Sequence, residues 1–66
     1  MGTSRPSTVE RAYELARSGR YATVSEIRLR LRAEAYHDAV AQLEGRAIVA
    51  DLRRLIVAAR AEPSRA

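Results

Sequence analysis

The chain contains no cysteine, no tryptophan and no phenylalanine, so tyrosine, present three times, is its only large aromatic residue. Without cysteine, neither disulfides nor a thiolate zinc site can reinforce a small core. The scarcity of aromatic side chains also argues against single-strand binding by base stacking. A chain of 66 residues must then rely on aliphatic packing or on self-association for its stability.

Long apolar runs and glycine-rich loops are missing as well. The longest apolar run, residues 55–59, has five residues, whereas a membrane span needs about 20. Residues 1–6 lack the apolar segment of a signal peptide, so we expect a cytoplasmic protein with no membrane partner. The three glycines lie far apart in the sequence, which excludes a phosphate-binding glycine loop.

The residues that enzymes use most often are nearly absent. His37 is the only histidine, and no serine lies near it in the sequence. Glu34 and His37 have the Glu-x-x-His spacing of di-iron carboxylate bundles, but such sites also need further inward-facing glutamates. A domain this small has little structure for an oxyanion hole and a substrate cleft. We therefore predict that the protein is not an enzyme, with no catalytic residues, no cofactor and no metal site.

Basic residues outnumber acidic residues in this sequence. All twelve basic residues are arginine, and with eight acidic residues they give a net charge of +4. This balance favours a polyanionic partner. Arginine suits such a partner because its guanidinium binds phosphate through two parallel hydrogen bonds. The alternative is that arginines mixed with acidic residues only keep a helical surface solvated.

Two segments predict helix starts with the same chemistry. Residues 7–10 and 23–26 both match the capping box, in which a hydroxyl accepts from an early helix amide and a glutamate reaches back. We predict that the first helix covers residues 8–17. It ends at Ser18 and Gly19, because glycine readily takes the left-handed conformation that closes helices.

Residues 27–32 carry two patterns. Val24, Ile27 and Leu31 form one stripe at helical spacing, with Leu29 nearly opposite, yet apolar residues and arginines also alternate as in a strand. We favour the helix, because the capping box precedes this segment and its residues are mostly good helix formers. Leu29 is then exposed and available to a partner.

The rest of the chain predicts two more helices. Asp38 is the expected N-cap of a short helix that runs to Glu44 and is closed by Gly45. A final helix covers residues 46–62 and ends before Pro63, which disfavours helical geometry in its predecessor.

The predicted fold class is therefore all-α, a small bundle of three main helices plus one short helix, helix-turn-helix-like in arrangement. The helical domain covers residues 7–62, between disordered polar tails at 1–6 and 63–66. The predicted core consists of Val9, Tyr13, Ala16, Ile27, Leu31, Val40, Leu43, Ile48, Leu52, Leu55 and Ile56.

Four motifs in chain order resemble those of short, uncharacterised bacterial helical proteins and of small helix-turn-helix domains. They are Val9 to Gly19, Val24 to Leu31, Leu43 to Gly45, and Leu52 to Leu55. The second resemblance implies a capped helix, a turn and a further helix that together contact DNA. If residues 27–32 are instead extended, the order strand, helix, helix is similar to ribbon-helix-helix repressors, whose paired strands enter the major groove.

From charge and pattern together we predict a small basic DNA-binding or regulatory protein. Its predicted phosphate contacts are Arg28, Arg32, Arg53 and Arg54. The alternative is a protein-interaction adaptor that docks a partner through apolar residues the monomer does not bury. Those residues, which we also expect at the interface of a homodimer, are Leu29, Val49 and Val57.

Overall fold

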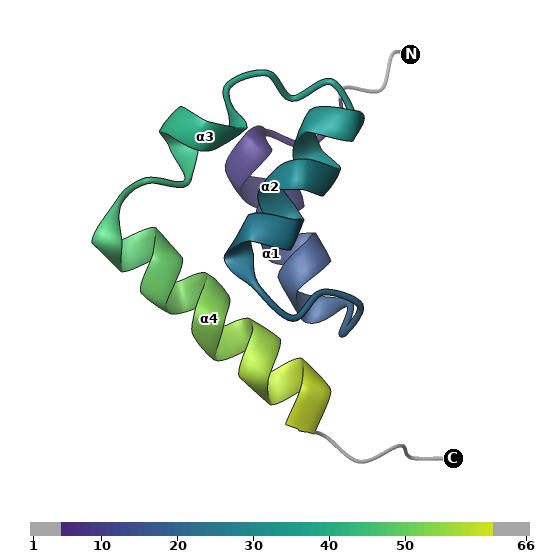
Figure 1. The fold of residues 1–66 in the computed structure, drawn as a ribbon, viewed down its shortest axis with the longest axis vertical. Helices are drawn as coiled ribbons and strands as arrows, with labels where there is room; N and C mark the ends of the chain where they lie inside the picture. The colour runs from purple at the N-terminus through teal and green to yellow at the C-terminus, as the bar shows by residue number, and fades with distance from the viewer. Residues whose placement is uncertain (1–4, 62–66) are drawn as a thin grey trace.

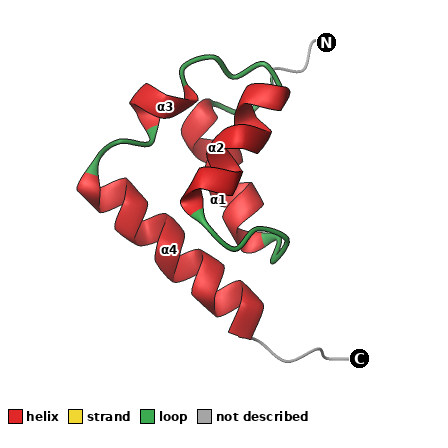
Figure 2. Cartoon of the chain, in the orientation of Figure 1, coloured by secondary structure: helices red, strands yellow, loops and turns green. Residues whose placement is uncertain are grey.

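A computed structural model describes residues 5–61. Their secondary structure is helical, with no strand among them, as Figures 1 and 2 show. The helices are α1 (Thr8–Arg17), α2 (Val24–Ala33), α3 (Ala39–Gln42) and α4 (Arg46–Ala61). The all-α prediction is confirmed, and the ribbon-helix-helix alternative is wrong because residues 27–32 lie within α2. Residues 1–4 of the predicted tail at 1–6, the whole predicted tail at 63–66, and Glu62 lie outside the described residues.

Both predicted helix starts are present. The Ser7 hydroxyl accepts from the Glu10 amide at 3.1 Å, and the Glu10 carboxylate accepts from the Ser7 amide at 3.0 Å. At α2 the Thr23 hydroxyl accepts from the Glu26 amide at 3.1 Å. The Glu26 carboxylate binds the Ala22 amide at 2.7 Å, one residue before the cap, so this capping box is shifted. Two backbone donors are satisfied at each start.

The two longer connections turn through left-handed residues. Gly19 has φ +78° after α1, as predicted. At the end of α2 the left-handed residue is Ala35, with φ 71°. The Tyr36 amide donates to the Leu31 carbonyl and the Ala35 amide to the Arg32 carbonyl, both at 2.9 Å. This pair of bonds is the Schellman motif, here formed without glycine.

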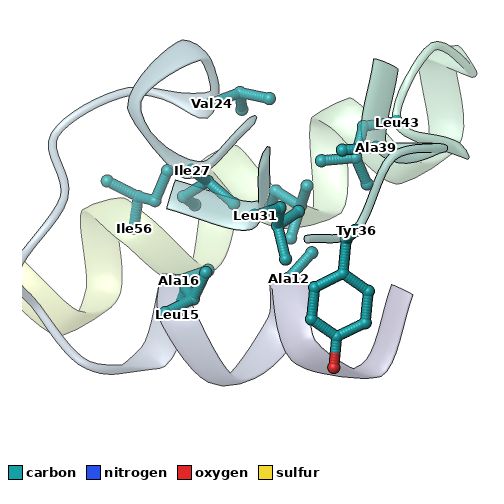
Figure 3. Close-up of a cluster of buried hydrophobic side chains, with 11 residues drawn as sticks. Ala12, Leu15, Ala16, Val24, Ile27, Leu31, Tyr36, Ala39, Leu43 and Ile56 are labelled. Carbon is teal, nitrogen blue, oxygen red and sulfur yellow. The ribbon is translucent and has the colours of Figure 1, made fainter. Parts of the chain in front are cut away.

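The core lies around α1, which contacts all three other helices. Figure 3 shows the buried side chains of α1 and α2 meeting those of α3 and α4. The largest fully buried side chains are Ile27, Leu31, Leu43 and Leu52, all predicted. Because α1 is covered by several neighbours, it also buries Ala12 and Leu15, while Val9 and Tyr13 are only partly buried. Placing Val40 in the core was wrong.

The segment around α3 differs from the prediction. Val40 is 50% exposed, because this one-turn helix directs Ala39 toward the core and ends at Gln42, before the predicted Glu44. Asp38 precedes the helix but makes no capping bond with its side chain. Its carboxylate instead accepts from the Thr8 hydroxyl at 2.6 Å, which ties the start of α3 to the start of α1.

Arg5 and Pro6, which the sequence analysis placed in the tail at 1–6, make contacts with the helical domain. The Arg5 guanidinium lies 3.9 Å from the centre of the Tyr36 ring and donates to the Glu34 carbonyl at 2.9 Å. The Tyr36 hydroxyl donates to the Pro6 carbonyl at 2.7 Å. Arg5 and Pro6 therefore belong to the folded domain, and the left-handed turn that follows α2 holds them there.

Candidate nucleic-acid interface

Most of the acidic side chains that pair with arginine do so on the α1 side of the molecule. Glu34, at the end of α2, accepts from Arg11 through two bonds of 2.8 Å and from Arg30 at 2.9 Å. Arg11 also binds Glu14 at 2.9 Å. The hydrogen bonds from Arg11, more than those from Arg30, lower the pKa of Glu34 to about 2, and they raise the pKa of Arg11. Here arginine joins two helices and is not free for a ligand.

Arg54, a predicted phosphate contact, belongs to a second pair of this kind. It donates to Asp51, which also accepts from the Tyr13 hydroxyl at 3.3 Å. Burial, and then the Asp51 charge, raise the pKa of Tyr13. Arg54 lies about 100° around α4 from Arg53, so the two adjacent arginines leave the helix in different directions. The structure therefore separates Arg54 from the other predicted contacts.

Arg28 and Arg53, from different helices, line one groove. The groove has a volume of about 230 Å³ between the start of α2 and the side of α4, and we call it the α2–α4 groove. Its lining residues are Ala22, Thr23, Val24, Ser25, Arg28, Val49 and Arg53. Arg53 is exposed, whereas Arg28 is half-buried. Two of the predicted phosphate contacts, Arg28 and Arg53, therefore border one groove that is open to an anion.

Arg28 also has a structural role that the sequence did not reveal. Its Nη2 donates to the Leu43 carbonyl at 3.0 Å, at the end of α3. Its Nε is buried and has no hydrogen-bond partner among the described residues. One side of this guanidinium therefore binds the α3–α4 connection, and the phosphate contact of Arg28 stays a prediction.

The start of α2 adds backbone donors to the groove. The first amides of a helix have no acceptor within the helix, and the helix dipole places partial positive charge there. Thr23 and Glu26 satisfy the amides of Glu26 and Ala22, respectively. The amides of Val24 and Ser25 lie at the first two helical positions and have no acceptor in the preceding turn. Such amides are suited to an anion.

Further arginines lie on the same flanks of both helices. At about 100° per residue, Arg32 follows Arg28 along α2, and Arg46 and Arg60 lie on the flank of α4 that carries Arg53. Arg32, Arg46 and Arg53 are exposed and make no ion pair within the described residues. No acidic residue occupies these two flanks. We call this surface, made of the α2–α4 groove with Arg32 and Arg46, the basic face.

The predicted interface residues fall into two groups. Leu29 and Val57 are each 65% exposed, as expected. Val49 was expected to be uncovered, but it is half-buried and packs against the core beside the groove. Leu29 also lines a shallow hollow of about 490 Å³ with Tyr21, the half-buried residue that follows α1 in the connection to α2.

Other kinds of site are not found in residues 5–61. There, no group of three or more histidine, cysteine, aspartate or glutamate side chains is placed to hold a metal ion. Within the same residues no helix has both the length and the apolar character to cross a bilayer. No protein-family model matches the sequence, and no match is found among curated proteins or solved structures.

Proposed function

We propose that the protein is a small nucleic-acid-binding protein that holds the phosphates of a duplex on its basic face. One observation carries this proposal: Arg28 and Arg53, from two different helices, line the same groove beside the first amides of α2. Arg32 on α2 and Arg46 on α4 are exposed and make no ion pair within the described residues. Basic side chains of two helices thus meet at one groove.

The mechanism of binding is electrostatic. Arg53 and the amides at the start of α2 border the same groove, so one phosphate can accept from both. Arg32 and Arg46 lie along the helices to either side and reach neighbouring phosphates. Each phosphate that is neutralised releases counterions, which makes the affinity depend on salt. Three such contacts give a slope of log K against log salt of about −2.7, which is about a 40-fold loss of affinity between 50 and 200 mM salt.

A pair of adjacent variants tests the basic face. Arg53→Gln and Arg54→Gln remove the same charge from neighbouring positions, but only Arg53 lines the groove. We expect Arg53→Gln to weaken the binding of a nonspecific duplex and to reduce the salt slope by about 0.9. Arg54→Gln should leave the slope unchanged. Fluorescence anisotropy over a salt series measures both, and equal effects of the two substitutions would reject the proposed surface.

The second candidate function is a protein-interaction adaptor, favoured by the exposure of Leu29 beside Tyr21. In that case Leu29→Asp abolishes partner capture and leaves duplex binding intact. The same exposure, with that of Val57, keeps a homodimer as our proposed assembly. Sedimentation at high micromolar concentration should then detect dimer, and a monodisperse monomer would exclude it. We also propose the cytoplasm, where DNA is accessible, as the location.

A further inference from the structure

One side of α2 is free of neighbouring elements in the described structure. Figure 1, viewed along the shortest dimension of the molecule, shows α1 behind α2 and nothing in front of it. That dimension is 18 Å, which is about two helix layers, since packed helix axes lie about 8–10 Å apart. Another helix can therefore pack on the outward side of α2 without displacing a described element.

The exposed residues on this outward side are arranged evenly about Leu29. At about 100° per residue, Ser25 and Ala33 lie about 40° to either side of Leu29, and Glu26 and Arg32 lie about 60° to either side. The carboxylate lies about 4.5 Å before the leucine along the helix axis, on one flank, and the guanidinium lies equally far after it, on the other flank. One apolar side chain is thus placed midway between opposite charges.

This arrangement is complementary to itself. A two-fold axis through Leu29, perpendicular to α2, moves each residue that precedes Leu29 on one flank to the matching place after Leu29 on the opposite flank. Glu26 then meets the partner's Arg32, and Arg32 meets the partner's Glu26. The two leucines meet at the axis. Ser25 meets the partner's Ala33, so only small side chains separate the two helices there.

The contacts that Glu26 and Arg32 make within the chain leave both groups able to form these pairs. One carboxylate oxygen of Glu26 accepts from the Ala22 amide at 2.7 Å, and the second oxygen can accept from a partner. Arg32 is exposed and makes no ion pair among residues 5–61. Arg30, on the same flank as Glu26, is bound to Glu34 instead.

We propose that α2 pairs antiparallel with α2 of a second copy of this chain, about a two-fold axis at Leu29. The inference rests on the homodimer proposed above and assigns it to one surface, to which Val57 on α4 does not belong. Charge complementarity favours a second copy over a duplex here, because Glu26 lies as near to Leu29 as Arg32 does and repels phosphate. Arg32 has five donors, so it can bind the partner's Glu26 and still offer donors to a phosphate beside the pair.

Reversal of each charge tests this pairing by sedimentation equilibrium of the full chain. Glu26→Arg places two basic groups at each pair, and Arg32→Glu places two acidic groups there. Each single variant should dimerise about tenfold more weakly than the wild type. An equimolar mixture of the two variants should form a heterodimer about as tight as the wild-type dimer, because each pair then joins one basic and one acidic side chain.

Four further variants complete the test. Glu44→Arg reverses an exposed charge outside α2, and Val57→Asp changes an apolar residue that is as exposed as Leu29 but lies on α4. Neither should change the dimer, whereas Leu29→Asp should abolish it. Glu26→Gln keeps an acceptor for the Ala22 amide and should weaken the dimer less than Glu26→Arg does. Circular dichroism checks that each variant is folded.

The outcomes separate this inference from the earlier proposals. A dimer that neither charge reversal weakens, or a mixture that associates no better than the single variants, would overturn the pairing and leave a homodimer through another surface. Equal loss of dimer in Leu29→Asp and Val57→Asp would overturn it as well. A monodisperse monomer of the wild type at high micromolar concentration would reject both the pairing and the homodimer. The test contains no nucleic acid, so a failure of the proposed duplex binding in the salt series would not affect it.

Discussion

Substitution of Glu34 by glutamine tests the network that joins α1 to the end of α2. The Glu34 side chain is 21% exposed and accepts three hydrogen bonds from Arg11 and Arg30. These arginines lower its pKa from 4.5 to about 2. The difference corresponds to at most ~3 kcal/mol of folding free energy, which solvent screening of a partly exposed network reduces to ~1–2 kcal/mol. For a domain of this size that loss lowers Tm by about 5–10 °C.

The stability that Glu34 contributes should depend on pH. The pKa of Glu34 is lower in the folded state, so its contribution is complete above pH 4.5 and is lost as the pH falls toward 2. Urea unfolding should show the wild type more stable than Glu34→Gln at pH 7, with the difference vanishing near pH 2. Glu14→Gln is the matched control, because Glu14 binds Arg11 but is 49% exposed. A constant difference between wild type and Glu34→Gln at all pH values, or an equal loss in Glu14→Gln, would refute the assignment.

Three further predictions concern the fold, and thermal unfolding measures them all. Ala35→Gly should stabilise the protein by ~0.5–1 kcal/mol, because φ 71° is unfavourable for alanine; unchanged or lower stability contradicts this. Tyr36→Phe removes the bond to the Pro6 carbonyl and should destabilise by ~1 kcal/mol, and no loss would show that this bond adds nothing. Leu52→Ala empties a fully buried position and should destabilise by ~2–5 kcal/mol, whereas Val57→Ala, at an exposed one, should change stability by less than ~0.5 kcal/mol.

The sequence predicted the features that depend on local chemistry. The hydroxyl caps at Ser7 and Thr23 and the glycine after α1 act within a few residues, so their positions could be read directly. The predicted burial of Ile27 and Leu31 is also confirmed, because the buried side of a helix has the same residue spacing whichever element covers it. The strand alternative for residues 27–32 is wrong. A helix buries Ile27 and Leu31 on one side and leaves Leu29 as the only exposed apolar residue, although apolar residues and arginines alternate along this segment.

The features missed from the sequence depend on contacts between distant segments. Tyr36 joins the core because a left-handed alanine turns the chain back toward Pro6, and nothing in alanine itself predicts that conformation. In the same way, Arg28 is directed to the Leu43 carbonyl by the packing of α2 against α3. Arg54 differs from Arg53 already in the sequence, because Asp51 lies three residues before Arg54, a spacing that pairs side chains on one side of a helix. The groove beside Arg53, in contrast, depends on how α2 and α4 pack together.

The most direct test of the basic face is an NMR titration of the isotope-labelled chain with a short DNA duplex at low salt. We predict that the largest amide shift changes occur at Val24, Ser25, Arg32 and Arg53, and that they fade as salt is added. The opposite result, with the largest changes around Tyr13 and Arg54 or with no changes at all, would contradict the account.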